Sequence, residues 1–396
     1  MARNRIIYQS EALFVGPTTG GTTGDHSELH RVQDISHDMS ATRTDIYEFG
    51  RLAALDRQII EAPTVSLDFS YLLTDGQNEA DMGMIVDGIT EISTDASFLS
   101  GILKDDLNGG LEKNYYVVTV PEGEDADDDE ANWSSDNYNS RSVVGFGNGV
   151  ISNYSVNGAV GDFASASVSI EAYNVSFISG QSDTTAWVTG ATLPSVDKGT
   201  NGLQDGGFEL AQPTTGNSNV FALRPGDITM DFKRDGSRIN ELSVGGAILP
   251  NGDPDDGAAN PQSMHLQNFS IEAPLARTSL TRLGSTFPYF KAIDFPQECT
   301  VNTSAYLADV STGSLVDLIC NDQRYDVEVL MKVPCAGDVD DDSGATNLKY
   351  TIKNAVLVSQ NFSASIGDTK TVDLSFTATY GGARDTGNGL FISGTA

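Results

Sequence analysis

The stretch PTVSLDFSYLL, from Pro63 to Leu73, alternates apolar and polar residues along its length. Its apolar positions are Val65, Leu67, Phe69 and Tyr71, and the residues between them are Ser66, Asp68 and Ser70. Successive side chains of a β-strand point to opposite faces, so this period of two predicts a half-buried strand. The stretch therefore indicates a sheet with one face in a core and the other toward water.

The composition of the whole chain agrees with a β-rich fold. The 396 residues are enough for roughly two or three domains. A hydrophobic fraction of 39% is typical of a folded globular protein. The chain holds 40 glycines and 13 prolines beside many Ser, Thr, Val and Tyr residues, which favours strands and turns.

The formal net charge of -32 excludes one class of function and leaves two explanations open. Proteins that bind nucleic acid for long present clustered Lys and Arg, which neutralise phosphates, and this chain lacks that excess. The charge fits a surface that repels DNA or stays soluble at high density, and it also fits adaptation to a salty environment. The two explanations are compatible.

The cysteines and the amino-terminal stretch indicate neither a disulfide framework nor export. Cys299, Cys320 and Cys335 are odd in number and scattered, so we expect small buried apolar residues rather than disulfides or a zinc site. The start, MARNRIIYQSEALFVG, lacks the apolar core of a secretory signal. No window approaches the ~18 apolar residues of a membrane span, so we expect synthesis in a cytosol and no membrane span.

The most informative feature is an internal repeat. Glu11 to Thr44 and Gly246 to Thr278 each contain a short apolar strand, a Gly-rich loop, an alternating strand and an Arg-Thr pair. The two apolar strands are Ala12-Leu13-Phe14 and Ala247-Ile248-Leu249, the alternating strands are RVQDISHDM and HLQNFSIEA, the pairs are Arg43-Thr44 and Arg277-Thr278, and Gly50 and Gly284 follow at the same spacing. Similar blocks at two places in one chain indicate two similar structural units.

The parallel continues in the same order along the chain. The alternating strand at Pro63 has a counterpart in ECTVNTSAYLA from Glu298. Two short helices are predicted next, with apolar stripes of Phe98, Leu99, Ile102 and Leu103 in the first and of Leu315, Val316, Ile319 and Cys320 in the second. Then come the acidic loops after Val120-Pro121 and Val333-Pro334, and closing strands that share Gly161-Asp162 and Gly367-Asp368.

These blocks predict a mainly β protein with two tandem β-sandwich or barrel domains, each with one short packed helix. We place the first domain at residues 1–178 and the second at 239–396. Residues 179–238 comprise a linker rich in Gly, Ser and Thr and a bridging strand, GDITMDFKRDG, near 221–233. The sequence does not decide which domain owns that strand.

One acidic loop holds the candidate metal ligands. Asp338, Asp340 and Asp342 have the spacing that opens a calcium-binding EF-hand loop. The rest of that motif is missing, because its sixth position is Ser343 and its twelfth is Lys349. A solvated turn is the simpler interpretation, so we assign no metal site and no cofactor.

No arrangement of residues points to catalysis, so we expect a protein that is not an enzyme and assign no catalytic residues. His26, His30 and His37 follow a Gly-rich turn, and HSELH lacks the glutamate beside the first histidine of a zinc-protease helix, which favours a surface loop. The stretch GFGNG, Gly145 to Gly149, leads into a strand and not into a helix N-terminus, so it lacks the amides that cradle a phosphate.

A duplicated, acidic β protein of this kind resembles the major tail tube protein of long-tailed (siphovirus-like) bacteriophages and related archaeal viruses. The residues that carry the resemblance are RTDIYEFGRLAALDRQIIEAPTVSLDFSYLL, from Arg43 to Leu73, and the closing segments around SVSI and GDTKTVDLSF. They look like the long loop-to-strand segment and the carboxy-terminal strands of tube domains.

The resemblance implies a structural virion protein, made in the host cytoplasm and located in the tail. In that family β domains form stacked rings, and members with two domains per chain assemble as homotrimers with pseudo-sixfold symmetry. It further implies passage of DNA through the tube, with tail terminator, tape-measure and tail-tip proteins as partners. Residues 43–60 and 277–294 would then reach neighbouring subunits or the adjacent ring.

Two other classes of protein fit the same residues. One is another virion component, such as a decoration or baseplate β-sandwich protein. The other is a surface module that binds calcium or a glycan through its acidic loops, which the Asp clusters favour and the missing secretion signal disfavours.

Overall fold

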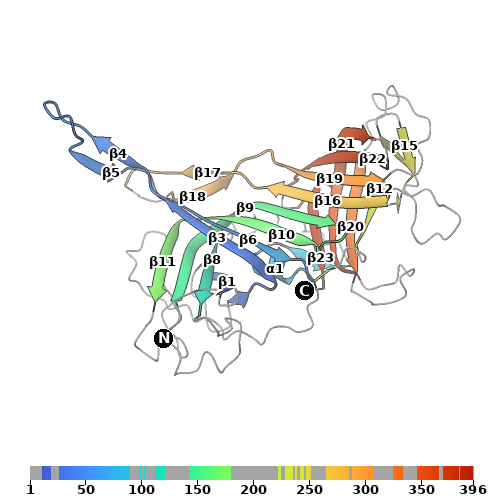
Figure 1. Cartoon of the computed structure of the whole chain (residues 1–396), viewed down its shortest axis with the longest axis horizontal. Coiled ribbons are helices and arrows are strands. Elements are labelled where there is room, and N and C mark those ends of the chain that lie inside the picture. Colours follow the sequence, from blue (N-terminus) through green and yellow to red (C-terminus); the bar gives the residue numbers. More distant parts are fainter. Residues whose placement is uncertain are drawn as a thin grey trace.

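The computed structural model describes residues 11–18, 26–89, 99, 102, 112–120, 142–179, 222–223, 228–234, 237–238, 241–244, 247–250, 265–284, 288–306, 324–332, 346–364, 369–382 and 384–395. Strands make up most of this part of the chain, which confirms the prediction of a mainly β fold. The molecule is elongated, and one hairpin projects beyond the rest of it (Figure 1).

The first half of the described chain forms two layers that share one long strand. One layer contains β1 (Glu11–Pro17), β2 (Ser27–Glu28), β8 (Lys113–Thr119) and β11 (Asn174–Ser179), and the other contains β3 (Val32–Ser40), β6 (Thr64–Leu72) and β10 (Ser165–Ala172). Strand β9 (Ser142–Ala159) pairs with β8 and β11 in its first part and with β10 in its second. Between these parts Asn148 has φ 52, a left-handed conformation that Asn tolerates better than most residues.

The second half repeats this layout around a second long strand. One layer contains β12 (Ile228–Arg234), β13 (Ser237–Arg238), β20 (Arg324–Lys332) and β23 (Gly389–Gly394), and the other contains β16 (His265–Pro274), β19 (Glu298–Tyr306) and β22 (Thr371–Thr379). Strand β21 (Thr346–Ser363) pairs with β20 and β23 in its first part and with β22 in its second. It also carries a left-handed asparagine, Asn354, with φ 60.

The core lies between the layers of each half and runs through both halves. The alternating strand β6 points Val65, Leu67, Phe69 and Tyr71 into it, as the period of two predicted. The ring of Phe69 lies 6.2 Å from that of Tyr115 on β8, and the ring of Phe376 on β22 lies 5.4 Å from that of Phe232 on β12. Aromatic contacts of this kind join the two layers of each half.

Two similar hairpins lie in corresponding places. Strands β4 (Arg43–Ile46) and β5 (Asp56–Ile59) follow β3, and strands β17 (Arg277–Leu280) and β18 (Phe290–Ile293) follow β16. We call them the first arm and the second arm. Both carry a left-handed glycine near the turn, Gly50 with φ 91 and Gly284 with φ 85, which explains the shared spacing of these glycines in the sequence.

One pairing of blocks from the sequence was wrong. Residues 247–249 were matched with 12–14, but Ala247–Pro250 is β15, which pairs only with β14 (Glu241–Val244) among the described strands. The strand that lies against β20, as β1 lies against β8, is β12. The bridging strand therefore belongs to the second half. Short apolar runs fit many edges of a sheet, so pattern alone could not choose between the two.

The two halves are joined by hydrogen bonds between strands. Strand β9 pairs antiparallel with β16, which produces one continuous run of strands in the order β3, β6, β10, β9, β16, β19, β22, β21. Strand β23 also pairs in parallel with β7 (Val86–Gly88). The halves therefore form one connected body.

The helices were predicted only in part. Leu99 and Ile102 of the first predicted stripe are helical and buried, whereas the second predicted helix, residues 311–322, lies outside the described residues. The sequence missed α1 (Gln77–Asp81), a short helix that begins after Gly76 with φ 95. Helix α1 buries Asn78 and Glu79 instead of an apolar stripe, so it has no apolar period to recognise.

Candidate functional site

The solvent face of the continuous run of strands is uniform in chemistry. Its side chains are small and polar, with carboxylates among them: Ser36 and Asp38 (β3), Ser66, Asp68 and Ser70 (β6), Ser165, Ser167 and Ser169 (β10), Asn153, Ser155 and Asn157 (β9), Ser270 and Glu272 (β16), Thr300, Asn302 and Ser304 (β19), Asp373, Ser375 and Thr377 (β22), Asn361 and Ser363 (β21). We call this set the polar face. None of these residues is buried.

The register shows that the polar face is continuous across both halves. On one ladder Ser70, Ser167, Ser155, Glu272, Thr300 and Thr377 lie side by side on successive strands. The opposite sides of the same strands supply core residues such as Ile170, Val156 and Ile271. Burial of one side thus fixes which side chains line the other.

The polar face contains no lysine or arginine at the positions named above. Described cations lie beside it. On the second arm the Lys291 Nζ lies 3.1 Å from the Glu171 Oε2 and Arg277 donates to the Ile151 carbonyl over 3.2 Å, and the Lys370 Nζ lies 5.6 Å from the centroid of the Phe362 ring. Hydroxyl and amide groups hydrate well, and carboxylates repel phosphates. Such a wall can border a polyanion without holding it.

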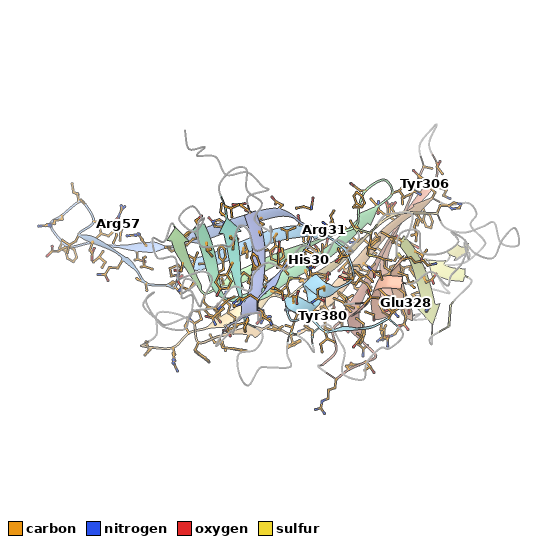
Figure 2. All side chains as sticks on the ribbon, turned by 90° about the horizontal axis from the view of Figure 1, so that it is seen from below. His30, Arg31, Arg57, Tyr306, Glu328 and Tyr380 are labelled. Atoms are coloured by element: carbon orange, nitrogen blue, oxygen red, sulfur yellow. The ribbon has the colours of Figure 1, made fainter. Side chains whose placement is uncertain are left out.

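The arms expose apolar side chains to solvent. On the first arm Phe49, which precedes Gly50, and Leu52, two residues after it, are fully exposed. Ile46, Tyr47 and Ile60 are exposed as well. On the second arm the fully exposed Leu283 precedes Gly284. Figure 2 shows Arg57 on the projecting first arm, at the other end of the molecule from Glu328. Apolar groups gathered on a projecting element are typical of a contact with another protein.

The junction of β9 and β16 is a third candidate element, because it joins the two halves of the chain. Seven residue pairs lie opposite each other there, from Asn268 beside Ala159 to Pro274 beside Asn153. Two backbone bonds extend it, from the Val160 N–H to the Gln267 carbonyl over 2.9 Å and from the Leu275 N–H to the Ser152 carbonyl over 2.8 Å. The backbone groups of both strands are thereby satisfied.

A buried polar cluster lies where the halves meet. The Glu79 carboxylate, 1% exposed, accepts hydrogen bonds from the Tyr71 hydroxyl over 2.7 Å and from the Tyr154 hydroxyl over 2.9 Å. The Tyr350 hydroxyl of the second half lies 2.7 Å from that of Tyr154. Burial raises the pKa of Glu79, and the tyrosine hydrogen bonds oppose that rise. We call these four residues the tyrosine cluster. Because the cluster is buried, a dissolved substrate cannot reach it, and its hydrogen bonds stabilise the fold.

Most of the residues proposed as sites from the sequence lie elsewhere or outside the described residues. Asp338, Asp340 and Asp342, and both acidic loops, fall outside them. In the described part no three His, Cys, Asp or Glu side chains converge to hold a metal ion, and no described helix has the length and apolarity to cross a membrane.

The structure corrects the prediction for one histidine and confirms that for one cysteine. His26 is buried and packs edge-on against Tyr116, with ring centroids 5.6 Å apart, so it does not lie in a surface loop. Strand β1 brings Gly16 against His26, and the missing side chain of that glycine makes the room. Cys299 is buried as expected. The stretch GFGNG lies within β9, so it is not a phosphate loop.

Sequence alone could not locate the surface found here. Each serine or asparagine of the polar face is unremarkable by itself, and only the pairing of the strands gathers these residues on one surface. The alternation from Val65 to Tyr71 was the available signal, and it indicated one solvated side for one strand.

No family model matches this chain. No curated protein matches it either. Solved structures do: the SPP1 tail tube is 11% identical with a TM-score of 0.27, and the match covers 53% of this chain and 100% of the tail tube chain. The tail of an empty gene transfer agent particle is 11% identical with a TM-score of 0.23 (44% and 100% covered), and an Hcp protein is 11% identical with a TM-score of 0.19 (42% and 98% covered).

Proposed function

We propose that this protein is a structural subunit of a virion tail tube, through which DNA passes during infection. In this proposal the chain consists of two tandem copies of one tube domain, three chains form a ring with six quasi-equivalent positions, and rings stack into a hollow tube. The polar face lines the channel.

The single observation that carries the proposal is the polar face. It extends over strands of both halves, and its named positions include carboxylates and no lysine or arginine. DNA carries about one negative charge per 1.7 Å of helix axis, so each cation on a channel wall would be a point of attachment. A wall of hydroxyl, amide and carboxylate groups lets DNA slide without such points.

The proposed duplication is supported by details that recur at matching places. Strands β3 and β16 each have a bulge at a glutamine, Gln33 or Gln267, whose amide donates to the backbone carbonyls one and two residues before it. Strands β9 and β21 each carry a left-handed asparagine. β-Bulges and left-handed residues at matching positions, in the same order along the chain, are typical of two domains with the same fold.

Microscopy of the purified full chain tests the proposal. We expect negative-stain images of stacked rings with a central channel, and three protein masses per ring by light scattering of separated rings. A protein that remains monomeric at high concentration, or that forms particles without a channel, would exclude the tube. Loss of stability on adding EDTA would instead favour a calcium-dependent surface module.

A further inference from the structure

The two ends of the continuous run of strands are unpaired in the described part of the chain. At one end β3 pairs with β6 on one side, and no described strand pairs with its other side. At the other end the second part of β21 pairs with β22 on one side only. We call these the β3 edge, residues 34–40, and the β21 edge, residues 359–364. Such edges expose backbone N–H and C=O groups that can accept a further strand.

The same two kinds of strand already pair inside the chain. Strand β16 holds in the second half the place that β3 holds in the first, since each carries the glutamine bulge and is followed by an arm. Strand β9 corresponds in the same way to β21, with a bulge at Ser152 in one and Val358 in the other. The β9–β16 junction is therefore a template for a contact between the β21 edge and the β3 edge.

The core side of both edges is incomplete in the single chain. On β16 the core-facing Ile271 and Ala273 are 0% exposed, whereas their counterparts on the β3 edge are the exposed His37 and Met39, the latter 58% exposed. The fully buried Val156 of β9 corresponds to Phe362 of the β21 edge, which is 37% exposed. Strand addition would cover these side chains, as it does at the template junction.

Side-chain sizes also match across the two edges. At the template junction Phe269 lies over Gly158, where a Cβ would come within 2.3 Å of the Phe269 ring. The counterparts are Ile35 on the β3 edge and Ala364 on the β21 edge. Ile35 is smaller than Phe269 and Ala364 is larger than Gly158, so the summed volume of the two side chains is nearly the same at both places.

We propose that the β21 edge of one chain pairs antiparallel with the β3 edge of a second copy, in the register of the β9–β16 junction. Ile35 then lies opposite Ala364, Ser36 opposite Ser363, His37 opposite Phe362, Asp38 opposite Asn361, Met39 opposite Gln360 and Ser40 opposite Ser359. The pairing deepens the proposed function, on which it rests, because it names the contact that closes the ring. It also makes the polar face continuous from chain to chain.

The proposal assigns a role to Arg43, the arginine that begins the first arm. Its counterpart Arg277 begins the second arm and donates from Nε to the Ile151 carbonyl on β9. The residue of β21 that corresponds to Ile151 is Leu357. The guanidinium of the exposed Arg43 therefore binds the Leu357 carbonyl of the neighbouring copy.

Disulfide trapping tests the register. Neighbouring antiparallel pairs alternate between Cα separations of about 5.5 and 4.5 Å, both within disulfide range. We therefore use two double variants of the full chain, Ser36→Cys with Ser363→Cys and His37→Cys with Phe362→Cys. The matched control, Ser40→Cys with Ser363→Cys, is off register by about 13 Å. Wild-type protein reports any cross-link through its native cysteines.

We expect at least one in-register variant to give tenfold more covalent oligomer under mild oxidation than the control. If the control cross-links as much as the in-register variants, the proposed pairing is wrong. If rings form in the microscope without in-register cross-links, the pairing is wrong and the proposal of a tube stands. In-register cross-links without rings retain the pairing and overturn the tube. The absence of both rings and in-register cross-links would overturn the pairing and the tube.

Two arginine variants give a second, independent readout. Arg277→Ala breaks a contact within the chain, so it should lower the thermal midpoint of the isolated subunit. Arg43→Ala should leave that midpoint unchanged and raise the protein concentration needed for assembly by about tenfold, the effect of ~1.4 kcal/mol in a charge-assisted bond. Equal effects of the two variants on the isolated subunit, or unaltered assembly of Arg43→Ala, would contradict the role of Arg43.

Discussion

The hydroxyl groups of Tyr154 and Tyr350 lie 2.7 Å apart, although the two residues belong to different halves of the chain. Both hydroxyls lie near the Glu79 Oε1, at 2.9 and 3.4 Å. The residues that correspond to Tyr154 and Tyr350 in the other halves are Gln360 and Val144, so the cluster occurs once and not twice. It lies where the two halves meet.

Truncation of Glu79 should destabilise the protein strongly. Glu79→Ala leaves buried tyrosine hydroxyls without their acceptor, which costs on the order of 3 kcal/mol in the free energy of unfolding. Glu79→Gln keeps a carbonyl acceptor and should cost much less. Chemical denaturation at neutral pH checks both. Equal loss in the two variants would show that packing and not hydrogen bonding matters at this position.

The pH dependence of stability should differ between the wild type and Glu79→Gln. The pKa of Glu79 is raised in the folded protein, above the ordinary value of 4.5, mainly by burial. An acid with a raised pKa contributes stability below its ordinary pKa, and that contribution is lost as pH rises through the folded value. Relative to Glu79→Gln, the wild type should therefore lose stability as pH rises above 4.5. Parallel unfolding curves of both proteins at each pH would check this, and a constant difference would contradict it.

The tip of the first arm should matter for assembly and not for folding. Phe49 and Leu52 are fully exposed, so the double variant Phe49→Ser and Leu52→Ser should unfold within about 0.5 kcal/mol of the wild type. Burial of each side chain in a contact between chains contributes about 1.5–3 kcal/mol, so assembly should weaken at least a hundredfold. Light scattering measures it. The control is Phe177→Ser, which removes an exposed aromatic residue of β11.

Cations on the polar face should create sites that hold DNA. Asp68→Lys with Asp373→Lys places two lysines on it, and the assembled variant should bind a short DNA duplex at low salt with an affinity that falls as salt rises. Fluorescence anisotropy measures this binding. The control is Asp68→Asn with Asp373→Asn, which removes the same two carboxylates without adding a cation and should not bind the duplex. Strong binding by the wild type would contradict a channel wall that does not hold DNA.

Packing at the β9–β16 junction should respond to a paired exchange. Gly158→Ala alone forces a Cβ against the Phe269 ring and should cost about 1–3 kcal/mol. Phe269→Ile alone leaves a space and should also cost stability. The double variant Gly158→Ala with Phe269→Ile has the same residue types as the Ile35 and Ala364 pair. Its loss in the free energy of unfolding should therefore be clearly smaller than the sum of the losses of the two single variants. A double-mutant cycle of unfolding free energies tests it, and simple additivity would count against the correspondence of the two junctions.

The sequence by itself determined the class of fold and the positions of most strands. The alternation from Val65 to Tyr71 fixed which side of β6 is buried, because the side-chain period of a strand leaves no other choice. Gly50 and Gly284 recur at the same spacing in the sequence, and the structure shows that both adopt a left-handed conformation. The burial of Cys299 followed from its chemistry.

Only the tertiary structure decided which strands are neighbours. Residues 247–249 look like 12–14 in sequence, yet β12 takes the place against β20, because hydrogen bonding and burial choose among several suitable apolar runs. The tyrosine cluster joins side chains from α1, β6, β9 and β21, and no local pattern connects them. The polar face and the two open edges arise in the same way, since pairing between distant strands gathers residues that are unrelated along the chain.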